Sequence, residues 1–303
     1  MKSLLFVESP LQLLNAFEAI KKFELSEYIL VIRLSNRRTN DRQILYLIEK
    51  LKLKNIHIIS INVDKRTLID YSKLFFCRFR YIFNVVDKVF IGNFNSGFFR
   101  IIMKQFHRKD IILLDDGAKS IDIQKKFSNL FNYNLFTIYD FVPLKNQKIY
   151  KNNYLALKIN LNHLVINSNC ILFLGLKLSE FGIISEKYYL EIIEKISRNY
   201  TDKEIIYVSH REEKKSKLEK IEKFSNLKII QLDYPVELYG LYQNEIPYKI
   251  CSLYSTALLT MKKIYRVEVE SFKFDYSESE YKNIIDNVYE YYSKYIEVKE
   301  LDD

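Results

Sequence analysis

Short apolar segments alternate with longer amphipathic segments along most of the chain. In the first half, the short segments are rich in branched residues and predict strands at Leu4–Val7, Ile29–Leu34, Ile56–Ile61, Val89–Ile91 and Ile111–Leu114. The segments between them have apolar residues at helical spacing and predict helices at Leu11–Phe23, Gln43–Leu51, Leu68–Phe83 and Gly97–Phe106. A strand followed by a helix, repeated, is typical of a parallel sheet with helices on both faces.

A polar, irregular segment, Asn129–Asn169, interrupts the alternation, and we predict a domain boundary inside it, near residue 155. Further strands are predicted at Cys170–Leu174, Ile205–Val208, Lys228–Leu232, Lys249–Cys251 and Tyr265–Val269. Further helices are predicted at Tyr188–Ile196, Glu212–Phe224, Val236–Tyr242, Ser255–Lys262 and, ending the chain, Glu278–Tyr295. The sequence thus predicts an α/β protein with two Rossmann-like domains, 1–155 and 156–303, that face a cleft. The last helix could pack back on the N-terminal domain.

Composition narrows the class of protein. The 303 residues are 48% hydrophobic and 15% aromatic, which is enough to bury sizeable cores. The net charge of +9 favours an anionic partner without selecting one. Three scattered cysteines with no CxxC pair indicate a reducing compartment, and no long apolar run predicts a transmembrane helix, so we expect a cytoplasmic protein.

Several familiar motifs are missing from the sequence. The six glycines form neither GxGxxG nor a P-loop, and the four histidines lack metal-ligand spacing. No Asp-x-Asp follows a strand, where it could hold a divalent cation. Basic residues are interleaved with acidic ones, as in Glu212–Lys220, which is typical of a solvated helix face. Nucleic-acid binding is therefore only an outside alternative.

Acidic residues follow one of the predicted strands directly. Ligands of open α/β sheets bind beyond the carboxyl ends of strands, and Asp115, Asp116 and Gly117 stand at such an end. Two neighbouring like charges raise one pKa, which suits a general base. An ordinary Asp-Gly turn is the alternative.

Two further strand ends offer groups that bind phosphate. His210 and Arg211 lie between a strand and a helix, where an imidazole and free amides could bind an anion. Ser255 and Thr256 open another helix and could bind phosphate oxygens. A surface histidine and a plain N-cap serine are the alternatives.

Three more residues complete this candidate site. Gly175 ends a strand and would allow the backbone to approach a ligand closely, and Glu180 follows it in the same loop. Glu237, in the first turn of a helix, could accept hydrogen bonds from ribose or merely favour the helix dipole. Together these residues predict one side of a nucleotide-phosphate site.

These motifs, in this order, resemble those of bacterial sialyltransferases. The resemblance covers Leu4 to about Val269 and rests on Val7–Asn15, Asp115–Gly117, His210-Arg211 and Tyr254–Met261. It is greatest to glycosyltransferase family fifty-two, the lipooligosaccharide and capsule sialyltransferases, and more distant to the bacterial polysialyltransferases. It implies a GT-B fold and an inverting, metal-independent transfer of sialic acid from CMP-sialic acid to a sugar hydroxyl, with galactose as the expected sugar, on a bacterial surface glycan.

The resemblance also implies a role for each residue. Asp116 would be the general base, with Glu180 competing for that role, and His210 would bind the donor phosphate together with Ser255 and Thr256. Gly175 would lie near the cytidylate and Glu237 near the ribose, while other substrate contacts would come from Ser9, Gln12, Asp115 and Arg211. The family's His-Pro is His210-Arg211 here, so the phosphate loop departs from the usual pattern.

The resemblance implies no cofactor and no metal. Its partners would be CMP-sialic acid and a glycan acceptor on lipooligosaccharide or capsule, with no nucleic acid. A place at the inner face of the cell membrane, with peripheral membrane contact, and a homodimer are both compatible with it. Two alternatives stay open: transfer of another CMP-activated nonulosonic acid, and polysialyl transfer.

Overall fold

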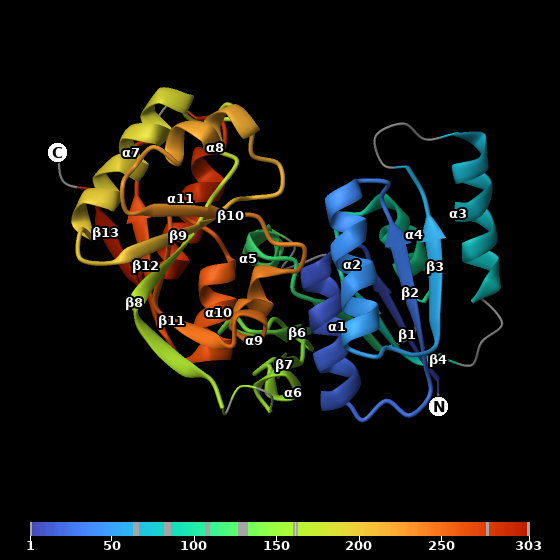
Figure 1. Cartoon of the computed structure of the whole chain (residues 1–303). Coiled ribbons are helices and arrows are strands. Elements are labelled where there is room, and N and C mark those ends of the chain that lie inside the picture. Colours follow the sequence, from blue (N-terminus) through green and yellow to red (C-terminus); the bar gives the residue numbers. More distant parts are fainter. Residues whose placement is uncertain are drawn as a thin grey trace. The chain divides into compact units, whose positions relative to one another are not determined.

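The computed structural model describes residues 2–62, 67–81, 86–106, 110–126, 133–159, 161, 163–276 and 279–301. The chain forms two compact units, Met1–Ala156 (unit 1) and Leu157–Asp303 (unit 2), each built on one parallel sheet (Figure 1).

Unit 1 has a seven-stranded sheet in the order β3-β2-β1-β4-β5-β6-β7. The strands are β1 (Lys2–Val7), β2 (Tyr28–Leu34), β3 (Ile56–Ser60), β4 (Val86–Ile91), β5 (Asp110–Leu114), β6 (Asn134–Thr137) and β7 (Ile149–Lys151). The helices are α1 (Pro10–Lys22), α2 (Arg38–Lys50), α3 (Leu68–Arg80), α4 (Gly97–Gln105) and α5 (Ala118–Lys126). Leu4 and Phe6 of β1 pack with α3 and α4, and the alternate residues Leu5 and Val7 are also fully buried. Both faces of the sheet are therefore covered, which explains the uninterrupted apolar strands.

Unit 2 has a six-stranded sheet in the order β10-β9-β8-β11-β12-β13. The strands are β8 (Val165–Leu174), β9 (Glu204–Val208), β10 (Leu227–Ile230), β11 (Glu245–Ser252), β12 (Glu268–Lys273) and β13 (Glu297–Glu300). The helices are α7 (Glu186–Asn199), α8 (Lys215–Ile221), the 3-10 turn η1 (Val236–Leu238), α9 (Tyr239–Gln243), α10 (Ala257–Tyr265) and α11 (Lys282–Tyr292). Ile285 and Tyr289 of α11 belong to the core of this unit.

The strands predicted for the first half lie within three residues of those observed, but the connecting segments differ more. Helix α2 begins five residues before the predicted start, and α5 was not predicted. The prediction that Asn129–Asn169 is irregular was wrong in part, because this segment contains β6, β7, the short helix α6 (Leu155–Lys158) and the start of β8. Strands β6 and β7 are short and include polar residues, so their hydrophobic pattern is weak. Residues 82–83, 129–132, 160 and 162 of these predictions lie outside the described residues.

Two predictions for the second half were also wrong. Tyr265 is the last residue of α10 rather than the start of a strand, and β12 begins at Glu268. A helix does not end the chain, because β13 follows α11 and pairs with β12. The predicted first residue of that helix, Glu278, lies outside the described residues.

A buried polar group joins the end of unit 1 to its first helix. The Asn15 side-chain oxygen accepts hydrogen bonds from Asn152 Nδ2 at 3.0 Å and from the Tyr154 hydroxyl at 2.6 Å. Nearby, Glu18 Oε2 accepts from the backbone N–H of Ala156 at 3.1 Å. Asn15, Asn152 and Tyr154 are almost entirely buried, so these bonds fix the segment after β7 against α1.

Candidate functional site

The strand order of unit 2 places its switch point between β8 and β11. From β8 the chain adds β9 and β10 on one side and then crosses to β11 on the other, and ligands of such sheets bind at the carboxyl edge of this point. Leu174 pairs with both Val208 and Ser252, so the loops after β8, β9 and β11 leave the sheet at one level. The structure thus brings the predicted loops of Gly175, His210 and Ser255 to one edge.

His210 is held as a neutral imidazole with a defined tautomer. The backbone N–H of Glu212 donates to His210 Nδ1 at 3.2 Å, so the ring proton lies on Nε2. Burial lowers the pKa of His210 to about 4, and the charges of Lys177 and Arg211 add to this effect. At neutral pH the ring can therefore donate one hydrogen bond through Nε2 without carrying a charge.

A buried ionic network lies directly behind His210. Glu213 Oε2 accepts from the backbone N–H of His210 at 2.6 Å, and its Oε1 accepts from the Tyr207 hydroxyl at 2.7 Å. The Lys217 ammonium lies 2.8 Å from Glu213 Oε1, 3.0 Å from Glu180 Oε2 and 4.1 Å from the centre of the Tyr189 ring. The side chains of Glu213 and Lys217 are 0% exposed, so the loop after β9 rests on a fully desolvated ion pair.

Glu180, predicted as a possible base, is fully engaged within this network. Its Oε1 accepts from the backbone N–H of Lys214 at 2.9 Å, and its Oε2 accepts from Lys217. Burial alone would raise the pKa of Glu180, but the hydrogen bonds from Lys214 and Lys217 outweigh it and lower the pKa. A carboxylate held in this way is a weak proton acceptor, and its evident role is to tie the loop after β8 to α8.

Gly175 is required by its neighbours in the protein. A Cβ at this position would lie 2.6 Å from both Glu213 Oε2 and the Tyr207 hydroxyl. The approach of a ligand to the Gly175 backbone stays a prediction, and the buried network beside it is a separate reason for a glycine at this position.

Ser255 and Thr256 open helix α10 at the other side of the switch point. Ser255 Oγ accepts from the backbone N–H of Ala257 at 3.4 Å, while the Thr256 side chain makes no capping hydrogen bond. Both side chains are partly exposed. Hydroxyls and free amides at the start of a helix are suited to binding an anion.

Glu237 and Arg211 are two further predicted site residues of unit 2, and the charge of Arg211 acts on the carboxyl of Glu237. Glu237 lies in η1 and is buried, which raises the pKa of its carboxyl, while the Arg211 charge acts in the opposite direction. Arg211 itself is exposed. A carboxyl can accept hydrogen bonds from hydroxyl groups, and a guanidinium can bind phosphate.

In unit 1 the switch point lies between β1 and β4, and Glu8 follows β1 there. Arg33 forms an ion pair with the Glu8 carboxylate, and Asn93 Nδ2 donates to it at 2.6 Å. Burial raises the pKa of Glu8, against the opposing effects of Arg33 and Asn93. Glu8 and Arg33 were not among the predicted site residues.

Gln12 connects this switch point to Asp116. Its Nε2 donates to Asp116 Oδ1 at 2.7 Å, and its Oε1 accepts from the backbone N–H of Glu8 at 2.9 Å. Ser9 is the N-cap of α1, and its Oγ accepts from the Gln12 N–H at 3.4 Å. Gln12 is buried, so within unit 1 it orients Asp116.

The two adjacent aspartates have different surroundings. Asp115 is buried and its Oδ2 accepts from the backbone N–H of Ile138 at 2.8 Å, while burial raises its pKa to about 7. The prediction attributed a raised pKa to the neighbouring like charge, but burial is the cause. Asp116 is partly exposed, with Lys119 Nζ 3.4 Å from its Oδ2, and Gly117 has φ of 65°, which completes the turn. Asp115 is thus used inside the unit, whereas Asp116 stands at the edge of the sheet with its side chain 14% exposed and its Oδ2 without a hydrogen-bond partner among the described residues.

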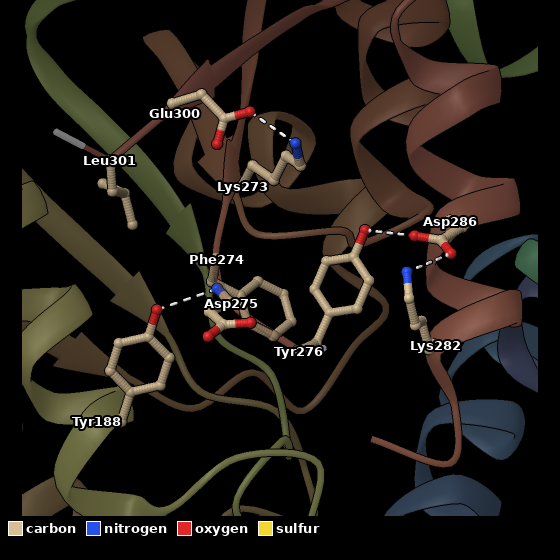
Figure 2. A pocket seen from close by; sticks show the side chains of 9 residues that line it. All are labelled: Tyr188, Lys273, Phe274, Asp275, Tyr276, Lys282, Asp286, Glu300 and Leu301. Atoms are coloured by element: carbon tan, nitrogen blue, oxygen red, sulfur yellow. Dashed lines mark hydrogen bonds and ion pairs between the residues drawn. The ribbon is translucent and has the colours of Figure 1, made fainter. Parts of the chain in front are cut away.

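Among the described residues of unit 2, three hollows lie away from this site. One, of about 460 Å³, lies at the carboxyl ends of β12 and β13 (Figure 2). Its polar groups bond to one another: Tyr276 and Lys282 to Asp286, and Lys273 to Glu300. In unit 1, a cavity of about 20 Å³ borders Asp115 and Asp116, which is room for a water molecule but not for a sugar.

Within the part of the chain that the structure describes, one group of carboxylates is close enough to share a metal ion. Oxygen atoms of Glu268, Glu270 and Glu297 lie within 4.8 Å of one another. The ammonium groups of Lys249 and Lys299 both bind Glu270, which balances this buried charge. This group therefore has a structural role.

The buried network was missed because its residues look like surface residues in sequence. Glu213 and Lys217 stand four residues apart in the charged segment that was predicted to be a solvated face. Tyr207, inward-facing in β9, was the available signal, because a buried tyrosine hydroxyl needs a partner.

The sequence and the structure were compared with those of known proteins. The family model for Alpha-2,8-polysialyltransferase (POLYST) matches residues 68–271. No sequence among the curated proteins matches this chain. Among solved structures, the chain is similar to UDP-GlcNAc 2-epimerase from Neisseria meningitidis bound to UDP-GlcNAc, with TM-score 0.62 and 13% identity over 99% of this chain and 95% of that one.

Two further structures show the same fold. UDP-GlcNAc 2-epimerase from Methanocaldococcus jannaschii has TM-score 0.58 and 13% identity, over 97% of this chain and 92% of that one. MurG from Acinetobacter baumannii has TM-score 0.53 and 11% identity, over 99% of this chain and 86% of that one. The predicted fold class, GT-B, is confirmed.

Proposed function

This chain belongs to the alpha-2,8-polysialyltransferase family, and we propose that it transfers sialic acid from CMP-sialic acid to a hydroxyl group of a glycan, with inversion and without a metal. The coarser assignment, a sialyltransferase-like glycosyltransferase of GT-B fold, follows from the family and the fold. The family match is the observation on which the proposal rests, and the matched range includes Asp116, Glu180, His210 and Ser255.

Donor binding is assigned to the carboxyl edge of unit 2. The leaving group, CMP, is a phosphate monoester with a second pKa near 6, so it needs stabilisation of negative charge more than it needs a proton. His210 would donate its Nε2 proton to a phosphate oxygen, and Ser255, Thr256 and the N-terminus of α10 would bind the others. Because the imidazole is neutral beforehand, a bound dianion would raise its pKa and draw a proton to the site.

Proton removal from the acceptor hydroxyl is assigned to Asp116. A sugar hydroxyl is a poor nucleophile at neutral pH and needs a positioned carboxylate as the new bond forms. Gln12 orients Asp116, which is partly exposed, whereas both oxygens of Glu180 are occupied by hydrogen bonds inside unit 2. Asp116 Oδ2 accepts no hydrogen bond from the residues that the structure describes and so has a lone pair free for a proton, which favours Asp116 over Glu180.

Ligand-induced thermal shift tests the donor class. Selective stabilisation by CMP is expected, with little effect of UDP or single-stranded RNA. The variant His210→Ala should lose the CMP shift, and His163→Ala, an exposed histidine of the same unit, should keep it. Stabilisation by UDP would indicate another nucleotide sugar, and stabilisation by RNA alone would support the nucleic-acid alternative; either result contradicts the proposal.

The family match specifically favours a second candidate, repeated transfer onto an acceptor that already ends in sialic acid. Mass spectrometry of products from galactosylated and sialylated acceptors separates the two. A single mass increment on galactosylated acceptors supports the lipooligosaccharide type of transfer, and a ladder on sialylated acceptors supports polysialyl transfer. CMP-activated relatives of sialic acid in the same assay test the choice of donor sugar.

A further inference from the structure

Helix α3 of unit 1 exposes an apolar face. Leu68, Ile69, Phe75 and Phe76 are all more than half exposed, and Leu68 reaches 88%. Their positions, i, i+1, i+7 and i+8, lie on one side of a helix, and Tyr71, 55% exposed, borders them. A surface helix normally turns such a face toward the core, so this arrangement needs an explanation.

The opposite face of α3 is the one that packs on unit 1. Cys77 and Tyr81, the residue directly after the helix, belong to the hydrophobic core, and Asp70 is buried. Asp70 Oδ2 accepts from the N–H and hydroxyl of Thr67 at 2.8 and 2.9 Å, which caps the start of the helix. One face of the helix therefore packs on the rest of unit 1, and the aromatic face is exposed.

Basic side chains flank the apolar face. Lys73 and Arg80 stand seven residues apart along one side of α3 and are exposed. On the adjacent helix α4, Arg100 and Lys104 are exposed, with the apolar Ile101, 45% exposed, between them. The only acidic residue of α3, Asp70, is buried, and its Oδ1 lies 4.0 Å from Lys73 Nζ. Arg80, Arg100 and Lys104 therefore supply most of the positive charge of this surface.

We propose that this surface, the outward faces of α3 and α4, binds the interface of an anionic lipid bilayer, with α3 lying in the plane of the membrane. An aromatic and aliphatic face flanked by lysine and arginine is the arrangement that interfacial helices use, and 13 residues give a length of about 20 Å. A second copy of the chain is a poorer fit, because a symmetric contact would bring the same cations together. Within the described residues no helix is both long and apolar enough to span a membrane.

Vesicle flotation tests this surface. The full chain should float with phosphatidylcholine vesicles that contain phosphatidylglycerol, and much less with phosphatidylcholine alone or at high salt. The double variant Phe75→Ser/Phe76→Ser should lower the partition coefficient at least about tenfold, because it removes the two aromatic rings that would insert into the lipid. Val142→Ser, which removes a side chain 82% exposed outside this surface, is the matched control and should bind like the wild type.

Further variants separate the apolar from the charged contribution. Leu68→Ser/Ile69→Ser should repeat the loss, and Lys73→Gln/Lys104→Gln should weaken binding to anionic vesicles only. Melting temperatures confirm that each variant is folded. Absence of flotation by the wild type, or equal flotation by Phe75→Ser/Phe76→Ser, overturns the proposal. So does light scattering that shows a dimer which the same variant dissociates, with no vesicle binding, since the surface would then join two copies.

Discussion

Replacing Lys217 by methionine tests the buried network most directly. The substitution keeps the length of the side chain and removes an ammonium that lies 2.8 Å from Glu213 Oε1 and 3.0 Å from Glu180 Oε2, and that donates to the Leu176 carbonyl at 3.2 Å. Removing one partner of a buried ion pair typically costs about 3–5 kcal/mol, because the other charge stays buried without compensation. For a unit of this size, that loss lowers the melting temperature by roughly 6–20 °C.

The cost should depend on pH in a defined direction. Burial already raises the pKa of Glu213 above its ordinary value, against the effect of Lys217, and losing Lys217 should raise it further. In the folded variant Glu213 then holds a proton that the unfolded chain has released, so the free energy of unfolding falls as pH rises above about 4.5. The penalty should therefore be larger at pH 8 than at pH 5.

Urea denaturation followed by far-UV circular dichroism measures this penalty. The matched control is Lys215→Met in the same helix, whose side chain is 91% exposed and 3.8 Å from Glu219, and which should cost no more than about 0.5 kcal/mol. The double variant with Glu213→Gln should recover part of the loss, because it removes the unpaired charge. Equal costs for the two lysines, or a penalty that does not change between pH 5 and pH 8, would refute the buried ion pair.

Four further outcomes are expected. The wild-type pKa of His210 is about 4, below its ordinary value, so the free energy of unfolding should fall by up to about 3 kcal/mol as the pH drops from about 6.5 to 4. His210→Gln should remove this part of the pH dependence, as measured by urea titrations at several pH values. Gly175→Ala should destabilise by about 1–3 kcal/mol, seen as a lower melting temperature, because its methyl group would lie 2.6 Å from buried oxygens. Asp116→Asn should lower kcat about 10²–10⁴-fold in a transfer assay, whereas Glu180→Gln should chiefly lower stability; the reverse pattern would make Glu180 the base. EDTA should leave turnover unchanged, and loss of turnover on chelation would contradict a metal-free mechanism.

Hydrophobic pattern predicted the central strands well because those strands are buried on both faces. Leu4–Val7 and Ile111–Leu114 are continuous apolar runs, and each is a strand of the observed sheet. The short strands β6 and β13 were missed because two of the four residues of β6 and three of the four residues of β13 are polar, so neither shows a clear apolar run.

Placing the candidate site needed only the order of strands and loops, but its electrostatics needed the structure. The sequence places His210 after a strand, and it cannot show that burial makes the imidazole neutral. It places Glu213 and Lys217 four residues apart, a spacing shared by exposed and buried ion pairs alike. Which of these two environments applies depends on Tyr207 and Tyr189, which come from other elements.

The amide of Asn15 has a practical consequence for anyone who wishes to produce the first half of the chain by itself. A truncation after Lys151 keeps every strand of that sheet. It removes both donors to the Asn15 oxygen, however, and leaves a buried polar atom without those partners. A truncation a few residues beyond Ala156 retains those donors and the N–H that Glu18 accepts. The longer fragment should therefore express as a stable species where the shorter one aggregates.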